Sequence, residues 1–308
     1  MQKFANVKSI CEMIGACGHR PFPSPPSTEK PAMDKDEHDQ QKEHKEQRAV
    51  QSVEIGGRLL LALAEHPGPM TLKDLAAKAG LPASRAHTYL VSFGRLRLIE
   101  QDAVTGRYAL GAAALQVGLS CLHQLDPLKV ATPVAEALAL AIDQTVAIAV
   151  WANFGPTIVR YIEASQPLHV SMRMGTVMSI LGTATGRAFV AALPKHRLEQ
   201  SLLGAWGDVP RRLDRSAVKD IDQEIKNIKA ELQQHGVVRA VGRPIPGVNA
   251  FSAAALDHEG HAALVITALG HEDNFPADWD SDIARAVRQA AAEVSLRLGY
   301  RVKASIGP

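Results

Sequence analysis

Residues 71–111, TLKDLAAKAGLPASRAHTYLVSFGRLRLIEQDAVTGRYALG, decide the fold of the N-terminal part of the chain. Thr71 followed by Asp74 is typical of a capping box, which predicts that a short helix begins there. Gly80 favours the end of that helix, because glycine readily takes the left-handed conformation found just beyond helix ends. Pro82 suits the first turn of a second helix. Two helices joined by so tight a turn predict a helix-turn-helix.

A hairpin follows the second helix, which continues to Phe93. Residues 98–101 and 107–110 have the composition of two short strands, and residues 102–106 are typical of the turn between them. Upstream, apolar residues recur at helical spacing from Val50 to Leu63 and stop before a Pro-Gly-Pro sequence. Three helices followed by a hairpin predict a winged helix-turn-helix.

Charge makes this domain a candidate for nucleic-acid binding. Residues 75–99 contain no acidic residue, yet they hold Lys78 and three arginines. Short polar side chains near the start of a recognition helix can reach base edges, whereas cations contact phosphate. A solvated helix face is the alternative explanation. We expect this domain to bind double-stranded DNA through Thr71, Ser84, Arg85, His87, Thr88, Tyr89, Arg95, Arg97 and Arg107.

The second half of the chain has a different pattern. A helix is expected over residues 111–125, and Asp126 with Pro127 is typical of the start of another, which runs to about residue 142. The later elements are expected to be strands at 146–151 and 157–162, helices at 185–193 and 216–235, two strands ending at Leu256 and Thr267, and a helix at 278–298. Strands and helices grouped in this way predict an antiparallel α+β domain.

Composition limits the classes of protein to consider. The chain has 308 residues, with 34 Lys and Arg against 32 Asp and Glu, and 46% of the residues are hydrophobic. This apolar content excludes a wholly disordered chain, and the net charge of +2 excludes a histone-like polycation. Three cysteines exclude a disulfide scaffold and favour a reducing compartment. We find neither a secretory signal nor a long apolar span, so we expect a cytoplasmic protein without membrane contact.

The first 47 residues differ from the rest. They contain a cluster of prolines, and residues 34–48 include no apolar side chain, so a disordered tail is predicted for residues 1–47. Cys11, Cys17 and His19 supply fewer than the four ligands of a structural zinc site, and we expect no metal there.

Catalytic motifs are weak. Residues 182–186 could face an anion at a helix start, but they lack the Gly-Lys-Ser/Thr ending of a phosphate-binding loop. No G-x-S-x-G nucleophile motif occurs. His258 and His261 have metal-like spacing, but a solvated turn is the better interpretation. We expect neither a cofactor nor an enzyme, although a C-terminal domain that converts a metabolite stays open as an alternative.

Several of these stretches together resemble the IclR family of bacterial transcription regulators. They are LKDLA at 72–76, GLPAS at 80–84, TGRYALG at 105–111 and TATGRA at 183–188, and residues 236–257 align without a gap. The resemblance extends over residues 49–303. It implies a winged helix-turn-helix at 48–111, a linker helix at 112–126 and a GAF-like, antiparallel-sheet effector domain at 127–303. It also implies a homodimer formed through the winged helix and linker helix, often paired into a homotetramer.

The same resemblance implies an effector pocket. Its lining would be Val170, Met178, Ala184, Thr185, Ala240, Val248, Ala250, Thr267 and Leu269. Relatives that bind small carboxylates tend to have more polar pockets, so we expect an apolar or aromatic effector here. The alternatives are that these residues simply fill the core, or that the protein is a partner-binding regulator without a ligand.

Arg97 departs from the family pattern, which usually has glycine at this position. If the position requires a positive φ, Arg97 is strained. Alternatively, Arg97 adds a contact to a DNA phosphate.

Overall fold

The computed structural model describes residues 50–165, 168, 172–194, 196, 198 and 220–301. The chain divides into two compact units, Met1–Gln124 and Leu125–Pro308. The tail predicted for residues 1–47, the candidate lining residue Val170 and the first four residues of the helix predicted at 216–235 lie outside the described residues. Each of the described helices is too short or too polar to cross a membrane.

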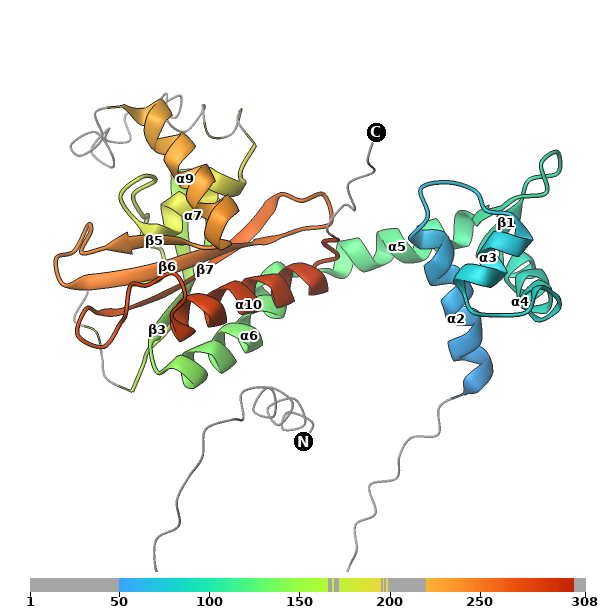
Figure 1. Ribbon diagram of the computed structural model, residues 1–308, viewed down its shortest axis with the longest axis horizontal. Helices are drawn as coiled ribbons and strands as arrows, with labels where there is room; N and C mark the ends of the chain where they lie inside the picture. The colour runs from blue at the N-terminus through green and yellow to red at the C-terminus, as the bar shows by residue number, and fades with distance from the viewer. Residues whose placement is uncertain are drawn as a thin grey trace, which may run out of the picture. The chain divides into compact units, whose positions relative to one another are not determined.

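The N-terminal unit is the predicted winged helix-turn-helix (Figure 1). Its elements are α2 (Gln51–Ala64), α3 (Leu72–Lys78), α4 (Ala83–Arg95), β1 (Ile99–Gln101), β2 (Tyr108–Leu110) and α5 (Ala112–Gln124). One buried cluster joins α2, α3, α4 and the hairpin, with Leu59, Leu75 and Leu90 among its members. Burial of these aliphatic side chains holds the three helices in fixed relation to the hairpin.

Local signals at the ends of α3 match the prediction. The Thr71 hydroxyl accepts a hydrogen bond from the Asp74 backbone N–H at 3.2 Å and donates one to the Asp74 carboxylate at 2.8 Å. Gly80 follows the helix with φ at +66°. Pro82 is the N-cap residue of α4, one position earlier than the first-turn position predicted for it.

The end of α4 explains the unusual arginine. The Arg97 N–H donates to the Gly94 carbonyl and the Leu98 N–H donates to the Phe93 carbonyl, each at 3.0 Å. This pair of bonds forms a Schellman motif, in which the residue just past the helix takes the left-handed conformation. Arg97 occupies that position with φ at +57°, so the predicted backbone strain is present.

The hairpin that forms the wing is closed by its own turn. Strands β1 and β2 pair antiparallel, with Gln101 opposite Tyr108. The Asp102 carboxylate accepts hydrogen bonds from the backbone N–H groups of Val104 and Thr105 and from the Thr105 hydroxyl. These three donors hold the pKa of Asp102 below its ordinary value.

The C-terminal unit is an antiparallel sheet between two pairs of helices (Figure 1). Its elements are α6 (Pro127–Ile142), β3 (Thr145–Ala152), β4 (Gly155–Ile162), α7 (Ala184–Ala192), α9 (Ile221–His235), β5 (Val238–Val241), β6 (Val248–Leu256), β7 (Ala262–His271) and α10 (Asp282–Arg297). The strand order is β4-β3-β7-β6-β5, and every neighbouring pair is antiparallel.

Alternation along the strands creates two cores. On β3, Val146 and Ile148 lie in the core that contains α6 and α10, whereas Ala147 and Ala149 lie in the core that contains α7 and α9. Successive strand residues point to opposite faces, so a strand covered on both sides is apolar throughout. The predicted antiparallel α+β class is confirmed.

Three details differ from the sequence prediction. Strand β5 was not predicted, β7 continues to His271 instead of ending at Thr267, and α10 begins at Asp282, four residues later than expected. Asp126 caps α6 as predicted, because its carboxylate accepts from the Leu128 and Lys129 amides.

Candidate functional site

The first turns of α4 present a polar, solvent-exposed face. Ala86 and Leu90 are buried, and they fix the inner side of the helix. The predicted DNA-contacting residues Ser84, Arg85, His87 and Thr88 are all exposed. Arg85 has no hydrogen-bond or ion-pair partner among the described residues, so its guanidinium is available to another molecule. This arrangement suits a helix that enters the major groove.

The other residues predicted to contact DNA lie away from the first turns of α4 or already have partners within the protein. Arg95 at the end of α4 and Arg97 just past that end are exposed. Arg107 is also exposed, but its guanidinium donates to the Pro69 carbonyl at 3.3 Å, which ties the wing to the loop before α3. The hydroxyl of Thr71 is engaged in the helix cap.

Tyr89 faces a different environment. Its ring is half-buried and packs against the core of the N-terminal unit. A Cβ atom added at Gly56 of α2 would lie 3.4 Å from this ring, which shows how closely the two helices approach. The ring of Tyr89 therefore contributes to packing between α2 and α4. Lys78, which the charge pattern included, pairs with Glu65 at 3.5 Å.

The C-terminal unit contains a cavity of about 230 Å³ on the α7 side of the sheet. The candidate lining residues Met178, Ala184, Thr185, Ala240, Val248, Ala250, Thr267 and Leu269 all border it. They come from α7, three strands and the segment before α7, and pairings such as Ala250 with Leu269 bring them together. Leu269 and Ala250 also pack in the core on this face of the sheet, so the cavity lies beside a packed core.

The lining is mostly aliphatic. Among its described residues it includes no carboxylate, histidine or cysteine, so those residues supply neither a general acid nor a general base. Its one charged member in the described part of the chain is Arg243, in the loop between β5 and β6. Sequence reasoning missed Arg243, because a lone arginine in an irregular loop has no local pattern.

A short chain of hydroxyl groups leads from the cavity lining into the protein. The Thr185 and Thr267 hydroxyls are 2.8 Å apart, and the Ser252 hydroxyl is 2.7 Å from that of Thr267. All three residues are buried. Because each hydroxyl can donate or accept, the Thr185 end can present either a proton or a lone pair. Ser252 was also absent from the predicted site.

Close packing sets the position of α7. Thr183 caps the helix by accepting from the Gly186 N–H at 3.1 Å, and its own hydroxyl donates to the Ser179 carbonyl at 2.6 Å. A Cβ atom at Gly186 would lie 2.1 Å from the Ser179 carbonyl oxygen, so only glycine allows this approach. Arg187 pairs with both Glu224 and Glu231, which ties α7 to α9.

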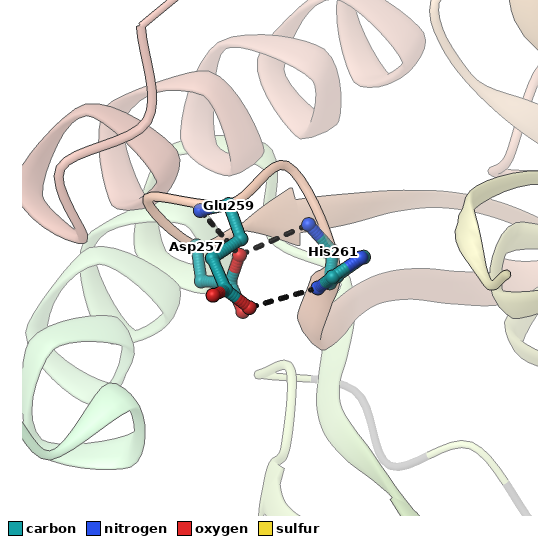
Figure 2. Close-up of side chains that lie close together, drawn as sticks. All are labelled: Asp257, Glu259 and His261. Carbon is teal, nitrogen blue, oxygen red and sulfur yellow. Dashed lines mark hydrogen bonds and ion pairs between the residues drawn. The ribbon is translucent and has the colours of Figure 1, made fainter.

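The turn between β6 and β7 contains a different polar cluster. Figure 2 shows the side chains of Asp257, Glu259 and His261 close together. The Asp257 carboxylate accepts from the backbone N–H groups of Glu259 and His261, both at 2.9 Å, and His261 Nδ1 lies 3.2 Å from the Glu259 carboxylate. These bonds close the turn predicted there, and His258 lies outside the cluster.

Comparisons with known proteins agree on one family. The IclR helix-turn-helix domain matches residues 52–103, and the family described as bacterial transcriptional regulator IclR C-terminal matches residues 119–296. Similar curated proteins include the transcriptional regulator KipR of Bacillus subtilis, 26% identical over 78% of this chain and 94% of its own, and the transcriptional repressor IclR of Escherichia coli, 25% identical over 81% and 90%. The crystal structure of Pseudomonas aeruginosa HmgR is 32% identical, with a TM-score of 0.72, over 82% of this chain and 99% of its own.

Proposed function

Because the chain belongs to the IclR family of bacterial transcription regulators, we propose that it binds a double-stranded DNA operator through α4 and the wing. We also propose that a small molecule in the cavity of the C-terminal unit changes that binding. The observation that carries the first part is the exposed polar face at the start of α4, held in place by buried residues on the opposite side.

The distribution of charge on α4 supports DNA binding. Arg85 is exposed in the first turns, where it can pair with guanine O6 and N7 or hold a phosphate. Arg95 at the end of α4 and Arg97 just beyond it suit contacts to the phosphate backbone. Ser84, His87 and Thr88 supply the short polar groups that read base edges.

The cavity supports the sensing of a small apolar molecule. Aliphatic side chains dominate its lining, and the hydroxyls of Thr185 and Thr267 are available to orient one polar group of the ligand. A ligand changes operator binding only if it favours one arrangement of the protein over another. The factor by which the small molecule changes the affinity for DNA sets the coupling free energy between the two sites. Bound DNA changes the affinity for the small molecule by the same factor.

Helix α5 supports association with a second copy. None of its residues is buried, although Leu115, Leu119 and Leu122 follow one another at helical spacing. Apolar side chains left in water in this way are typical of a surface that another protein covers. We propose a homo-oligomer in which α5 contributes to the contact.

The experiment starts with genomic DNA fragments selected by the purified full-length chain. Binding to a selected fragment is then compared for wild type, Arg85→Ala and Arg285→Ala, the last removing the same charge from an exposed position of the other unit. Loss of a base contact by Arg85→Ala should cost ~1–3 kcal/mol and relax preference at one base position in each half-site. If Arg85 holds only phosphate, the loss should be similar across sequences, and the slope of affinity against salt should fall by about 1.

Unchanged affinity in Arg85→Ala and also in Arg95→Ala would contradict the proposal, because it would leave the polar face of α4 without a role. If Arg285→Ala loses as much affinity for the DNA fragment as Arg85→Ala does, net charge alone governs binding.

A further inference from the structure

Arg243 occupies a distinctive position at the cavity. It lies in the loop between β5 and β6, and this loop contributes Arg243, Pro244 and Ile245 to the lining. Arg243 is exposed, whereas Thr185 and Thr267 are almost fully buried. The lining therefore combines an exposed cation with aliphatic side chains and buried hydroxyls.

Most arginines in the described part of this unit already have an acceptor. The pairs are Arg160 with Glu136, Arg187 with Glu224 and Glu231, Arg239 with the Ala277 carbonyl, Arg285 with Asp282, Arg288 with the His235 carbonyl, and Arg297 with Glu293. Arg243 and Arg173 have no such partner in the described residues, and of these two only Arg243 lines the cavity.

An unpaired guanidinium beside an apolar cavity selects for a particular chemistry. A carboxylate placed against aliphatic walls alone would lose its hydration without compensation, which is strongly unfavourable. Arginine offsets that loss, because its planar guanidinium can donate two parallel hydrogen bonds to one carboxylate. No carboxylate side chain in the described lining competes for Arg243.

We propose that Arg243 is the anion contact of this cavity and determines that its ligand is a monocarboxylate with an apolar body. This inference rests on the proposed sensing function, whose ligand it defines. The carboxylate pairs with the exposed Arg243, the body packs against the aliphatic side chains of the lining, and a hydroxyl or carbonyl group, where the ligand has one, meets Thr185 and Thr267.

The size of the cavity limits the ligand. At about 230 Å³ the cavity is small beside typical ligand pockets of about 300–1,000 Å³. This size favours a compact ligand such as a single ring with a short side chain.

The test uses pairs of compounds that differ only in charge. Binding of benzoate and benzamide, phenylacetate and phenylacetamide, and 3-methylbutanoate and its amide is measured by calorimetry on the full-length chain. The variants are wild type, Arg243→Gln and Arg173→Gln, because Arg173 is an exposed arginine whose side chain has no partner in the described residues and does not line the cavity. Circular dichroism of each variant verifies folding.

Wild type should bind the acid of a pair about tenfold more tightly than the amide, a value at the lower end of the range for a charged hydrogen bond because Arg243 is exposed. In Arg243→Gln the ratio should fall to about one with amide affinity unchanged, and Arg173→Gln should behave as wild type. The preference should also weaken as salt screens the contact.

Equal binding of acid and amide by wild type, or a preference that survives Arg243→Gln, would overturn the role of Arg243 while leaving the cavity a ligand site. If Arg173→Gln loses the preference for the acid as fully as Arg243→Gln does, the preference comes from general charge attraction and not from a specific contact. That result would also overturn the role of Arg243. Failure of every pair to bind would overturn the proposed ligand class, whereas the DNA-binding function is tested separately by the Arg85→Ala experiment.

Discussion

Replacement of Arg97 by glycine should stabilise the N-terminal unit. Arg97 takes φ at +57° at the end of the Schellman motif, and its side chain has no partner among the described residues, so glycine removes strain without removing a contact. The left-handed conformation costs a residue with a Cβ atom about 1–2 kcal/mol. Glycine loses more conformational freedom on folding, which offsets about 0.5–1 kcal/mol of that gain. The net increase in the free energy of unfolding should be about 0.5–1 kcal/mol.

Hydrogen exchange measured by mass spectrometry on the full-length chain can detect this change. Peptides covering α4 and the wing should exchange roughly two- to fivefold more slowly in Arg97→Gly, since exchange through local opening follows its free energy. Arg97→Ala is the matched control, because it removes the guanidinium but keeps the Cβ atom and the strain. Equal protection in both variants would refute the argument from φ. A loss of operator affinity in both would assign a DNA contact to the Arg97 side chain.

Three further predictions concern other parts of the chain. Gly186→Ala should lower the stability of the C-terminal unit by about 1–3 kcal/mol, because the added Cβ meets the Ser179 carbonyl, and an unchanged melting temperature would contradict this. The folded pKa of Asp102 lies below its ordinary value of 3.8, so the wing turn should hold above that pH and open as the pH falls through the lowered pKa; an NMR titration midpoint at or above 3.8 would contradict it. Leu115→Ser with Leu119→Ser should shift sedimentation toward the monomer without loss of helix in the C-terminal unit, and an unchanged sedimentation coefficient would exclude α5 from the contact.

Sequence patterns predicted the features that depend on neighbouring residues. The hydroxyl and carboxylate caps at Thr71 and Asp126 act on amides within three residues, and Gly80 meets a local backbone requirement. The strain at Arg97 was expected only on the condition that its position needs a positive φ, and that expectation came from the family resemblance, which has glycine there. The order of helices and hairpin then defined the winged helix.

Features that depend on distant residues were missed or misplaced. Strand β5 has four residues at the edge of the sheet, and its pairing with β6 is what identifies it. Gly270 is an unfavourable strand residue, but β7 continues past Thr267 because β6 pairs with it as far as His271. Gln144 and Phe275 pack so closely against Gly270 that a Cβ atom would clash.

The cavity shows the same limit. Its lining was inferred from a family resemblance, and no periodicity in the sequence separates residues around a hollow from residues in a filled core. Arg243 and Ser252 join the site only through the fold, because the β5–β6 loop and the pairing of Ser252 with Thr267 bring them there.

The uncovered apolar surface of α5 has a consequence for how operator occupancy responds to the amount of protein. A helix of 13 residues with no buried side chain gains little from its own chain, and isolated helices of this length are only marginally stable in water. Packing of a second copy against α5 would stabilise the helix, so the formation of α5 and the association of the subunits would be coupled. Occupancy of the operator would then rise more steeply than in proportion to protein concentration, and the cell could switch the response through modest changes in synthesis or degradation of the regulator.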